Sequence, residues 1–116
     1  RDPVDSSYYL FWGGIWGGQL QRWRSGSFDA SAESARETEP ADSPALLPRF
    51  ARLRHDMLEL AHAPRPVRIV DEAGAPLLAR DNRRRFFEGA WMHQRRGTYY
   101  FSWSTGDTHR IVYATA

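Results

Sequence analysis

The stretch that decides the fold is FFEGAWMHQRRGTYYFSWSTGDTHRIVYAT, residues 86–115. Residues 90–93 lead into a turn at 95–97, and the aromatic-rich run at 98–103 then predicts a strand. A second turn at 105–107 separates this run from another strand-like run at 110–114. A strand, a tight glycine turn and a second strand predict a β-hairpin.

Further strands are expected outside this region. Residues 8–12, YYLFW, form a strand-like run that ends at a glycine pair, and short strands are plausible at 19–24 and 67–70. The run SYYLFW at 7–12 also resembles TYYFSW at 98–103. Such a repeat is typical of propeller blades. Outside the middle of the chain, the sequence therefore predicts strands, as in an all-β fold.

Two segments in the middle of the chain are less regular. Residues 25–45 are rich in Ser, Ala, Glu, Asp and Pro, so we expect a polar loop inserted in the domain. Residues 46–62 carry apolar side chains at helical spacing, but part of the run also alternates as a strand would. Prolines on both sides limit any helix, and the residues alone leave these alternatives open.

Composition excludes several classes of function. The chain has no cysteine, which excludes disulfides and thiolate metal sites and fits a reducing compartment such as the cytoplasm without requiring one. No apolar run approaches ~20 residues, so no membrane span is expected. The net charge is only +2, and the run Arg83–Arg85 has acidic residues nearby, so we expect a solvated loop and no nucleic-acid partner. The spacing of the four histidines matches no standard metal motif.

Glu88 is the carboxylate in the most unusual setting, because aromatic residues flank it in FFEGAW, residues 86–91. It is either an exposed loop residue among buried rings or a carboxyl group held in an apolar pocket. An apolar pocket disfavours the charged form of a carboxyl group, which can then donate its proton to a leaving group near neutral pH. Gly89 permits an unusual backbone angle or the close approach of a ligand.

Two polar or glycine-rich segments are candidate binding regions. Residues 104–109, STGDTH, are either a turn whose side chains cap their own backbone or a cluster that hydrogen-bonds sugar hydroxyls. A serine hydrolase is disfavoured because no nucleophile-elbow glycine pattern surrounds Ser102 or Ser104. Trp16, flanked by glycine pairs, could present an aromatic face to a sugar ring.

The segments at 87–93, 97–109 and 111–115 resemble the general-acid region of family 43 glycoside hydrolases. Residues 8–21, with WGGIWGGQLQ, resemble the bacterial β-xylosidase and α-L-arabinofuranosidase branch. The resemblance implies a five-bladed β-propeller, of which this chain holds about two blades. It also implies that residues 49–70 are strands. The ends of the chain are then expected to be cuts within a longer catalytic domain.

The resemblance further implies inverting hydrolysis with no cofactor, acting on xylo- or arabino-oligosaccharides. Glu88 matches the family's general acid, and Asp2, in Asp2-Pro3, is a candidate for the aspartate that tunes the pKa of the acid. The base aspartate is expected upstream of Arg1, and the family's calcium or water site draws mainly on residues beyond Ala116, so no complete metal site is expected. Substrate contacts are expected from Trp16, Asp107, Thr108 and His109.

Two alternatives compete with a pentose-releasing glycosidase. The first is a non-catalytic carbohydrate-binding propeller, or a truncated inactive relative, that keeps the aromatic residues and lacks the base. The second is a plain structural β-domain in which Phe86, Phe87 and Trp91 are all part of the core.

Overall fold

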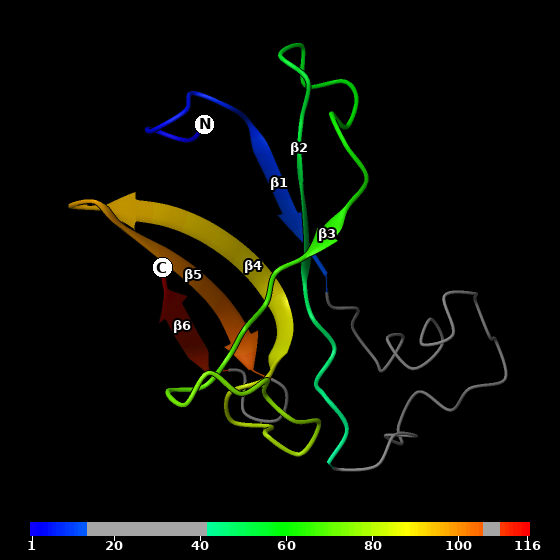
Figure 1. Ribbon diagram of the computed structural model, residues 1–116, viewed down its shortest axis with the longest axis vertical. Coiled ribbons are helices and arrows are strands. Elements are labelled where there is room, and N and C mark those ends of the chain that lie inside the picture. Colours follow the sequence, from blue (N-terminus) through cyan, green and yellow to red (C-terminus); the bar gives the residue numbers. More distant parts are fainter. Residues whose placement is uncertain (14–41, 106–109) are drawn as a thin grey trace, which may run out of the picture.

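The computed structural model describes residues 1–13, 42–105 and 110–116, and these residues form strands and no helix (Figure 1). The described strands form two antiparallel three-stranded sheets, in the orders β1-β2-β3 and β4-β5-β6. The predicted all-β fold is confirmed. The strands are β1 (Tyr9–Trp12), β2 (Arg49–Arg52), β3 (Arg65–Pro66), β4 (Phe86–Arg95), β5 (Thr98–Thr105) and β6 (Ile111–Thr115).

The β4–β5 hairpin has a two-residue turn, because Arg95 pairs with Thr98. Arg96 and Gly97 both have positive φ angles, 52° and 85°. Two positive φ angles define the type I′ turn, whose twist matches that of the strands it joins. The predicted turn is therefore confirmed. The strand β5 runs through Thr105, two residues beyond the predicted run at 98–103.

The helical spacing at 46–62 does not produce a helix in the structure. The family resemblance predicted strands over 49–70, and this is confirmed only at β2 and β3, because turns and bends occupy most of the segment between them. The predicted strand at 67–70 is wrong in its position, because the strand β3 covers only Arg65–Pro66. Prolines on either side of Arg65 lack the N–H group that a longer ladder would require. Val67 instead donates its N–H to the carbonyl oxygen of Pro48 at 2.8 Å, and Val70 forms an isolated bridge with Pro76.

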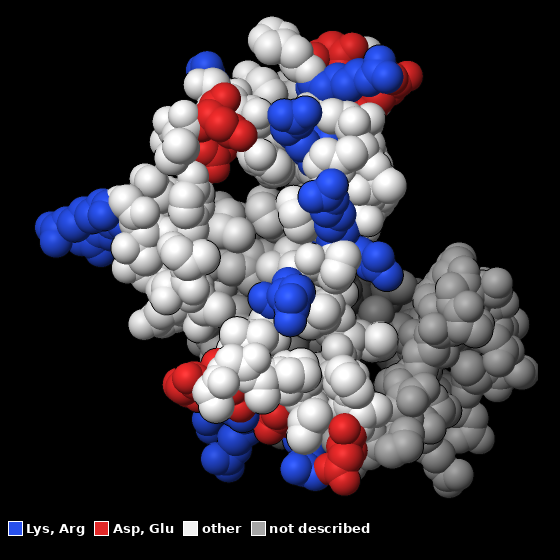
Figure 2. Space-filling view, in the orientation of Figure 1, with Lys and Arg blue, Asp and Glu red and all other residues white. Residues whose placement is uncertain are grey.

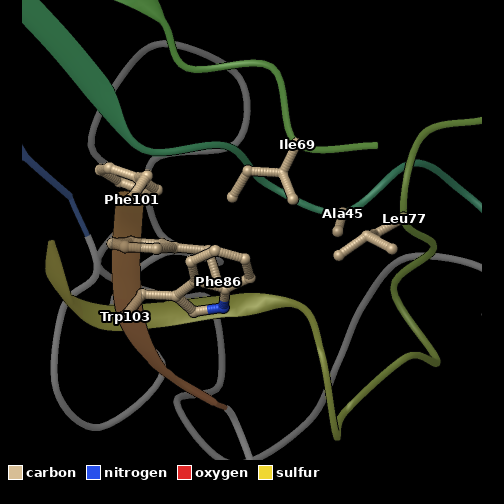
Figure 3. Packing of buried hydrophobic residues seen from close by; sticks show 6 residues of the cluster. All are labelled: Ala45, Ile69, Leu77, Phe86, Phe101 and Trp103. Atoms are coloured by element: carbon tan, nitrogen blue, oxygen red, sulfur yellow. The ribbon is translucent and has the colours of Figure 1, made fainter. Parts of the chain in front are cut away.

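The core lies on one face of the second sheet (Figure 3). Phe86, Phe101 and Trp103 are buried there, and the indole Nε1–H of Trp103 donates to the carbonyl oxygen of Arg84 at 2.9 Å. A buried indole normally needs such a partner, so this bond fixes the ring. Residues from the connecting segments complete the cluster, namely Ala45, Ile69 and Leu77.

Contacts between aromatic rings join the two sheets. The ring of Phe11, on β1, lies 5.8 Å from the ring of Phe101 on β5 and 5.9 Å from that of Phe50 on β2.

Part of the predicted polar loop at 25–45 also packs into the hydrophobic core. Ala45, at the end of that segment, is buried and donates its N–H to the carbonyl oxygen of Leu77 at 2.8 Å, whereas residues 25–41 lie outside the described residues.

Candidate active site

Glu88 lies on β4 between two irregularities of the strand. It pairs with Ser104 of β5, and the register shifts both between Phe86 and Glu88 and between Glu88 and Trp91. Each shift places an extra residue in β4, as in a β-bulge. Gly89, directly after Glu88, has a φ angle of 70°, which only glycine adopts without strain. The backbone therefore bends at the candidate residue.

Buried groups support the backbone opposite Glu88. Ser104 is 8% exposed and Thr105 is fully buried. The hydroxyl oxygen of Thr105 accepts the N–H of Arg110 at 3.2 Å, which fixes the end of the strand. Glu88 itself is half-buried. It is therefore a strand residue, and the exposed-loop interpretation does not hold.

The aromatic neighbours of Glu88 are not equivalent. Phe86 is buried in the core, whereas Trp91 is 68% exposed. The interpretation in which Phe86 and Trp91 are both core residues is therefore wrong for Trp91. The exposed rings continue across the sheet, because His93 lies 5.9 Å from Trp91 and stacks on Tyr100 at 5.2 Å with an interplanar angle of 10°.

Asp2 lies in an acidic turn that precedes β1. Its carboxylate accepts hydrogen bonds from the N–H groups of Val4 and Asp5 at 2.8 and 3.2 Å, and from the hydroxyl of Tyr99 at 2.8 and 3.0 Å. Burial raises the pKa of Asp2, but the bonds from Tyr99, Val4 and Asp5 together outweigh burial and hold this pKa below its ordinary value. Tyr9 donates to Asp5 in the same way at 2.9 Å.

Asp2 and Glu88 lie opposite different residues of β5. Asp2 is bound to Tyr99, whereas Glu88 pairs with Ser104, five residues further along β5. At about 3.4 Å per residue these two points of β5 are about 17 Å apart. Asp2 therefore has the contacts of a turn-forming residue, and its role in tuning Glu88 stays a prediction.

A groove of about 300 Å³ lies between the N-terminal segment and β4. Asp2 and Tyr99 line it together with Trp91 and His93, and Glu88 is not among its lining residues. The groove therefore combines a carboxylate, a phenol and exposed rings, but the candidate acid lies outside it.

The other predicted binding residues lie outside the described residues, namely Trp16, Asp107, Thr108 and His109. Within the described ranges, no three His, Asp or Glu side chains gather to hold a metal ion. No helix in the described part of the chain could cross a membrane. On the face shown in Figure 2, basic and acidic side chains lie side by side at the top and bottom, and several basic side chains follow one another down the middle.

Two side-chain contacts were not predicted from the sequence. They are the hydrogen bond from the hydroxyl of Tyr99 to Asp2 and the one from the N–H of Arg110 to the hydroxyl of Thr105. The double tyrosine at 99–100 is one available signal, because alternate residues of a strand face opposite sides. One tyrosine of such a pair therefore reaches the acidic turn, while the other joins the exposed rings.

Comparison with known proteins identifies relatives across nearly the whole chain. No protein-family model matches it. A xylosidase/arabinosidase from Bacteroides ovatus is 53% identical over 114 residues, which cover 98% of this chain and 34% of the relative. Xylosidase/arabinosidase 43A from Humicola insolens is 50% identical over 111 residues, covering 93% of this chain and 34% of the relative. The chain thus spans about a third of the length of the curated relatives it matches.

A solved structure shares the fold of this chain. It is a GH43 beta-xylosidase/alpha-arabinofuranosidase from a compost microbial metagenome, in complex with xylotriose and in a calcium-free form. The TM-score is 0.86 at 53% sequence identity, and the match covers 97% of this chain and 34% of that chain. The two sheets therefore correspond to part of that enzyme's β-propeller.

Proposed function

Because this chain belongs to glycoside hydrolase family 43, we propose that the complete protein releases xylose or arabinose from plant-type oligosaccharides by inverting hydrolysis. Glu88 is the general acid in this proposal. The names of the relatives support the class of reaction, and the xylotriose complex of the solved relative supports the class of substrate. Since the chain spans about a third of these relatives, the activity belongs to the complete protein.

The observation that carries the proposal is the position of Glu88 between two register shifts of β4. Bulges occur often beside active sites, where they re-aim a side chain. Half-burial on a strand backed by buried Ser104 and Thr105 holds the carboxyl group more rigidly than a loop would. A rigidly held carboxyl group is suited to delivering a proton in a fixed direction.

In the proposed reaction, the Glu88 carboxyl group protonates the glycosidic oxygen while the bond to the sugar breaks. An aspartate from outside these 116 residues removes a proton from the attacking water on the opposite face of the ring. An inverting pair of this kind stands about 6.5–9.5 Å apart, which leaves room for the water. Substrate contacts remain proposed for Trp16, Asp107, Thr108 and His109.

The test is Glu88→Gln in the complete protein, because glutamine keeps the shape of the side chain but has no acidic proton. We expect kcat on an alkyl or oligosaccharide xyloside to fall by about 10²–10⁴-fold, with little change in KM. An aryl xyloside with an acidic phenol leaving group needs little protonation, so its hydrolysis is expected to fall much less.

Glu72→Gln is the matched control, since the Glu72 side chain is 94% exposed and its 3.6 Å ion pair with Arg84 is a surface contact. Its kcat should equal that of the unchanged protein. Equal loss on both kinds of leaving group, or full activity of Glu88→Gln, would refute the role of Glu88. Sugar binding without turnover in the unchanged complete protein would instead favour the non-catalytic carbohydrate-binding alternative.

A further inference from the structure

Ser104 is a buried residue whose hydroxyl group has no hydrogen-bond partner among the described residues. It is only 8% exposed. Its neighbour Thr105 is also buried, but the hydroxyl oxygen of Thr105 accepts the N–H of Arg110 at 3.2 Å. Buried polar side chains are hydrogen-bonded in the large majority of cases, because an unpaired one has lost its bonds to water without replacement. We therefore expect the Ser104 hydroxyl to have a partner in the complete protein.

The cross-strand neighbours of Ser104 point to that partner. Because β5 lies between β4 and β6 (Figure 1), Ser104 has a paired residue on each side, Glu88 on β4 and Ile111 on β6. Paired residues project to the same face of an antiparallel sheet, with their Cβ atoms about 4.5–5.5 Å apart. Ile111 has no polar side-chain atom, and Ser102 lies about 7 Å away along β5. Of the two cross-strand neighbours, only Glu88 can bond the hydroxyl.

The carboxyl group of Glu88 also lacks a partner. Within the described ranges it forms no hydrogen bond and no ion pair, although the residue is half-buried. The bulge brings the strand close to Ser104 at this point, because a Cβ atom added at Gly89 would lie 3.8 Å from N and 3.9 Å from Cβ of Ser104. The flexible Glu88 side chain can reach a hydroxyl at such a separation. A buried donor and a half-buried acceptor, each without another described partner, therefore face each other across the ladder.

We propose that Ser104 is a positioning residue for Glu88, and that its hydroxyl donates a hydrogen bond to the Glu88 carboxyl group. This inference rests on the proposed role of Glu88 as general acid. The hydroxyl bonds to the carboxyl oxygen that does not carry the transferable proton, so Ser104 keeps its own proton while that of Glu88 moves to the glycosidic oxygen. The bond strengthens as the carboxylate forms, because hydrogen bonds to charged groups are the stronger ones. Ser104 thus both directs the acid and favours its reaction.

The test is Ser104→Ala in the complete protein, assayed on two kinds of substrate. On an alkyl or oligosaccharide xyloside we expect kcat to fall about tenfold with little change in KM, because the methyl group cannot hold the acid. An aryl xyloside with an acidic phenol leaving group needs little protonation, so its kcat should fall by less than about twofold. That second substrate also reports whether the variant is folded.

Ser102→Ala is the matched control, since Ser102 lies on the same strand and the same face but pairs with Trp91. Its kcat should equal that of the unchanged protein on both substrates. For Ser104→Ala, an equal loss on both kinds of leaving group would overturn the proposal, because it describes a general disturbance of the pocket. A rise in KM alone would overturn it as well, because it describes a contact with the sugar.

The double variant Glu88→Gln/Ser104→Ala separates this inference from the proposed function. If Ser104 acts through Glu88, the double variant should retain kcat within about twofold of Glu88→Gln alone. A further tenfold fall would overturn the positioning role. Full activity of Glu88→Gln would refute the proposed function and this inference together. A loss in Glu88→Gln that depends on the leaving group, combined with full activity of Ser104→Ala, would refute this inference alone.

Discussion

The hydroxyl group of Tyr99 donates to both carboxylate oxygens of Asp2, at 3.0 Å to Oδ1 and 2.8 Å to Oδ2, across 97 residues of sequence. This contact ties the turn before β1 to the tip of the β4–β5 hairpin. It also links the stability of the fold to pH. Burial raises the pKa of Asp2, but hydrogen bonds from Tyr99 and from two backbone N–H groups hold the pKa below its ordinary value of 3.8.

Replacing Tyr99 by Phe is expected to lower the stability of the complete protein at pH 7 and to weaken its dependence on acid. A carboxylate with a depressed folded-state pKa stabilises the fold above pH 3.8, and this contribution is lost as pH falls through the folded pKa. Without the hydroxyl, part of that contribution is absent at every pH. Urea midpoints at pH 7 and pH 3 should therefore differ less for Tyr99→Phe than for the unchanged protein.

Tyr113→Phe is the matched control, since Tyr113 is 66% exposed and contacts Tyr100 through its ring. Its urea midpoints should follow those of the unchanged protein at both pH values. If Tyr99→Phe also follows the unchanged protein, the contact with Asp2 contributes nothing to stability.

Gly13→Ala is expected to destabilise the protein through a steric clash. A Cβ atom at Gly13 would lie 3.1 Å from Cα of Pro48 and 3.2 Å from Cε1 of Phe86, and the φ angle of 143° disfavours any side chain. Overpacking of a core typically costs about 1–3 kcal/mol. Chemical denaturation measures this loss directly.

Gly74→Ala separates the clash from the backbone effect. Its φ angle is 80°, and a Cβ atom added there would have no neighbour within 4 Å, so only backbone strain of about 1–2 kcal/mol is expected. A smaller loss of stability for Gly13→Ala than for Gly74→Ala would contradict the packing of Gly13 against Pro48 and Phe86.

Gly89→Ala is expected to lower the kcat of the complete protein by more than its loss of folding stability can explain. A Cβ atom there would meet Ser104 only at ordinary contact distances of 3.8–3.9 Å, but the φ angle of 70° strains any residue other than glycine. Relief of that strain shifts the bulge that positions Glu88. A displacement of about 1 Å can cost about 10²-fold in rate, so we expect a fall in kcat of at least about tenfold with little change in KM.

Gly97→Ala carries the same kind of backbone strain in the β4–β5 turn, where φ is 85° and an added Cβ atom would have no neighbour within 4 Å. It should lose comparable stability while retaining kcat. Equal kcat for the two variants would show that the bulge at Gly89 does not position the proposed acid, Glu88.

Short-range patterns were sufficient to predict the hairpins. The glycine at 97 and the aromatic run at 98–103 specify a tight turn and a strand through local backbone preferences. Predictions were weaker where local signals conflict. At 64–70 the prolines shortened β3 to two residues, although Val67–Val70 is strand-like by composition.

The amino-acid sequence alone was enough to establish the all-β class, the β4–β5 and β5–β6 hairpins and the candidacy of Glu88, because strand alternation, turn chemistry and a family motif are all local properties. The folded chain was needed to show that Glu88 lies between two bulges, that Trp91 is exposed while Phe86 is buried, and that Asp2 binds Tyr99. These features depend on the register between strands and on contacts between residues far apart in the chain. A one-residue change of register reverses the face of every side chain, and away from a tight turn the register depends on which face the folded chain buries.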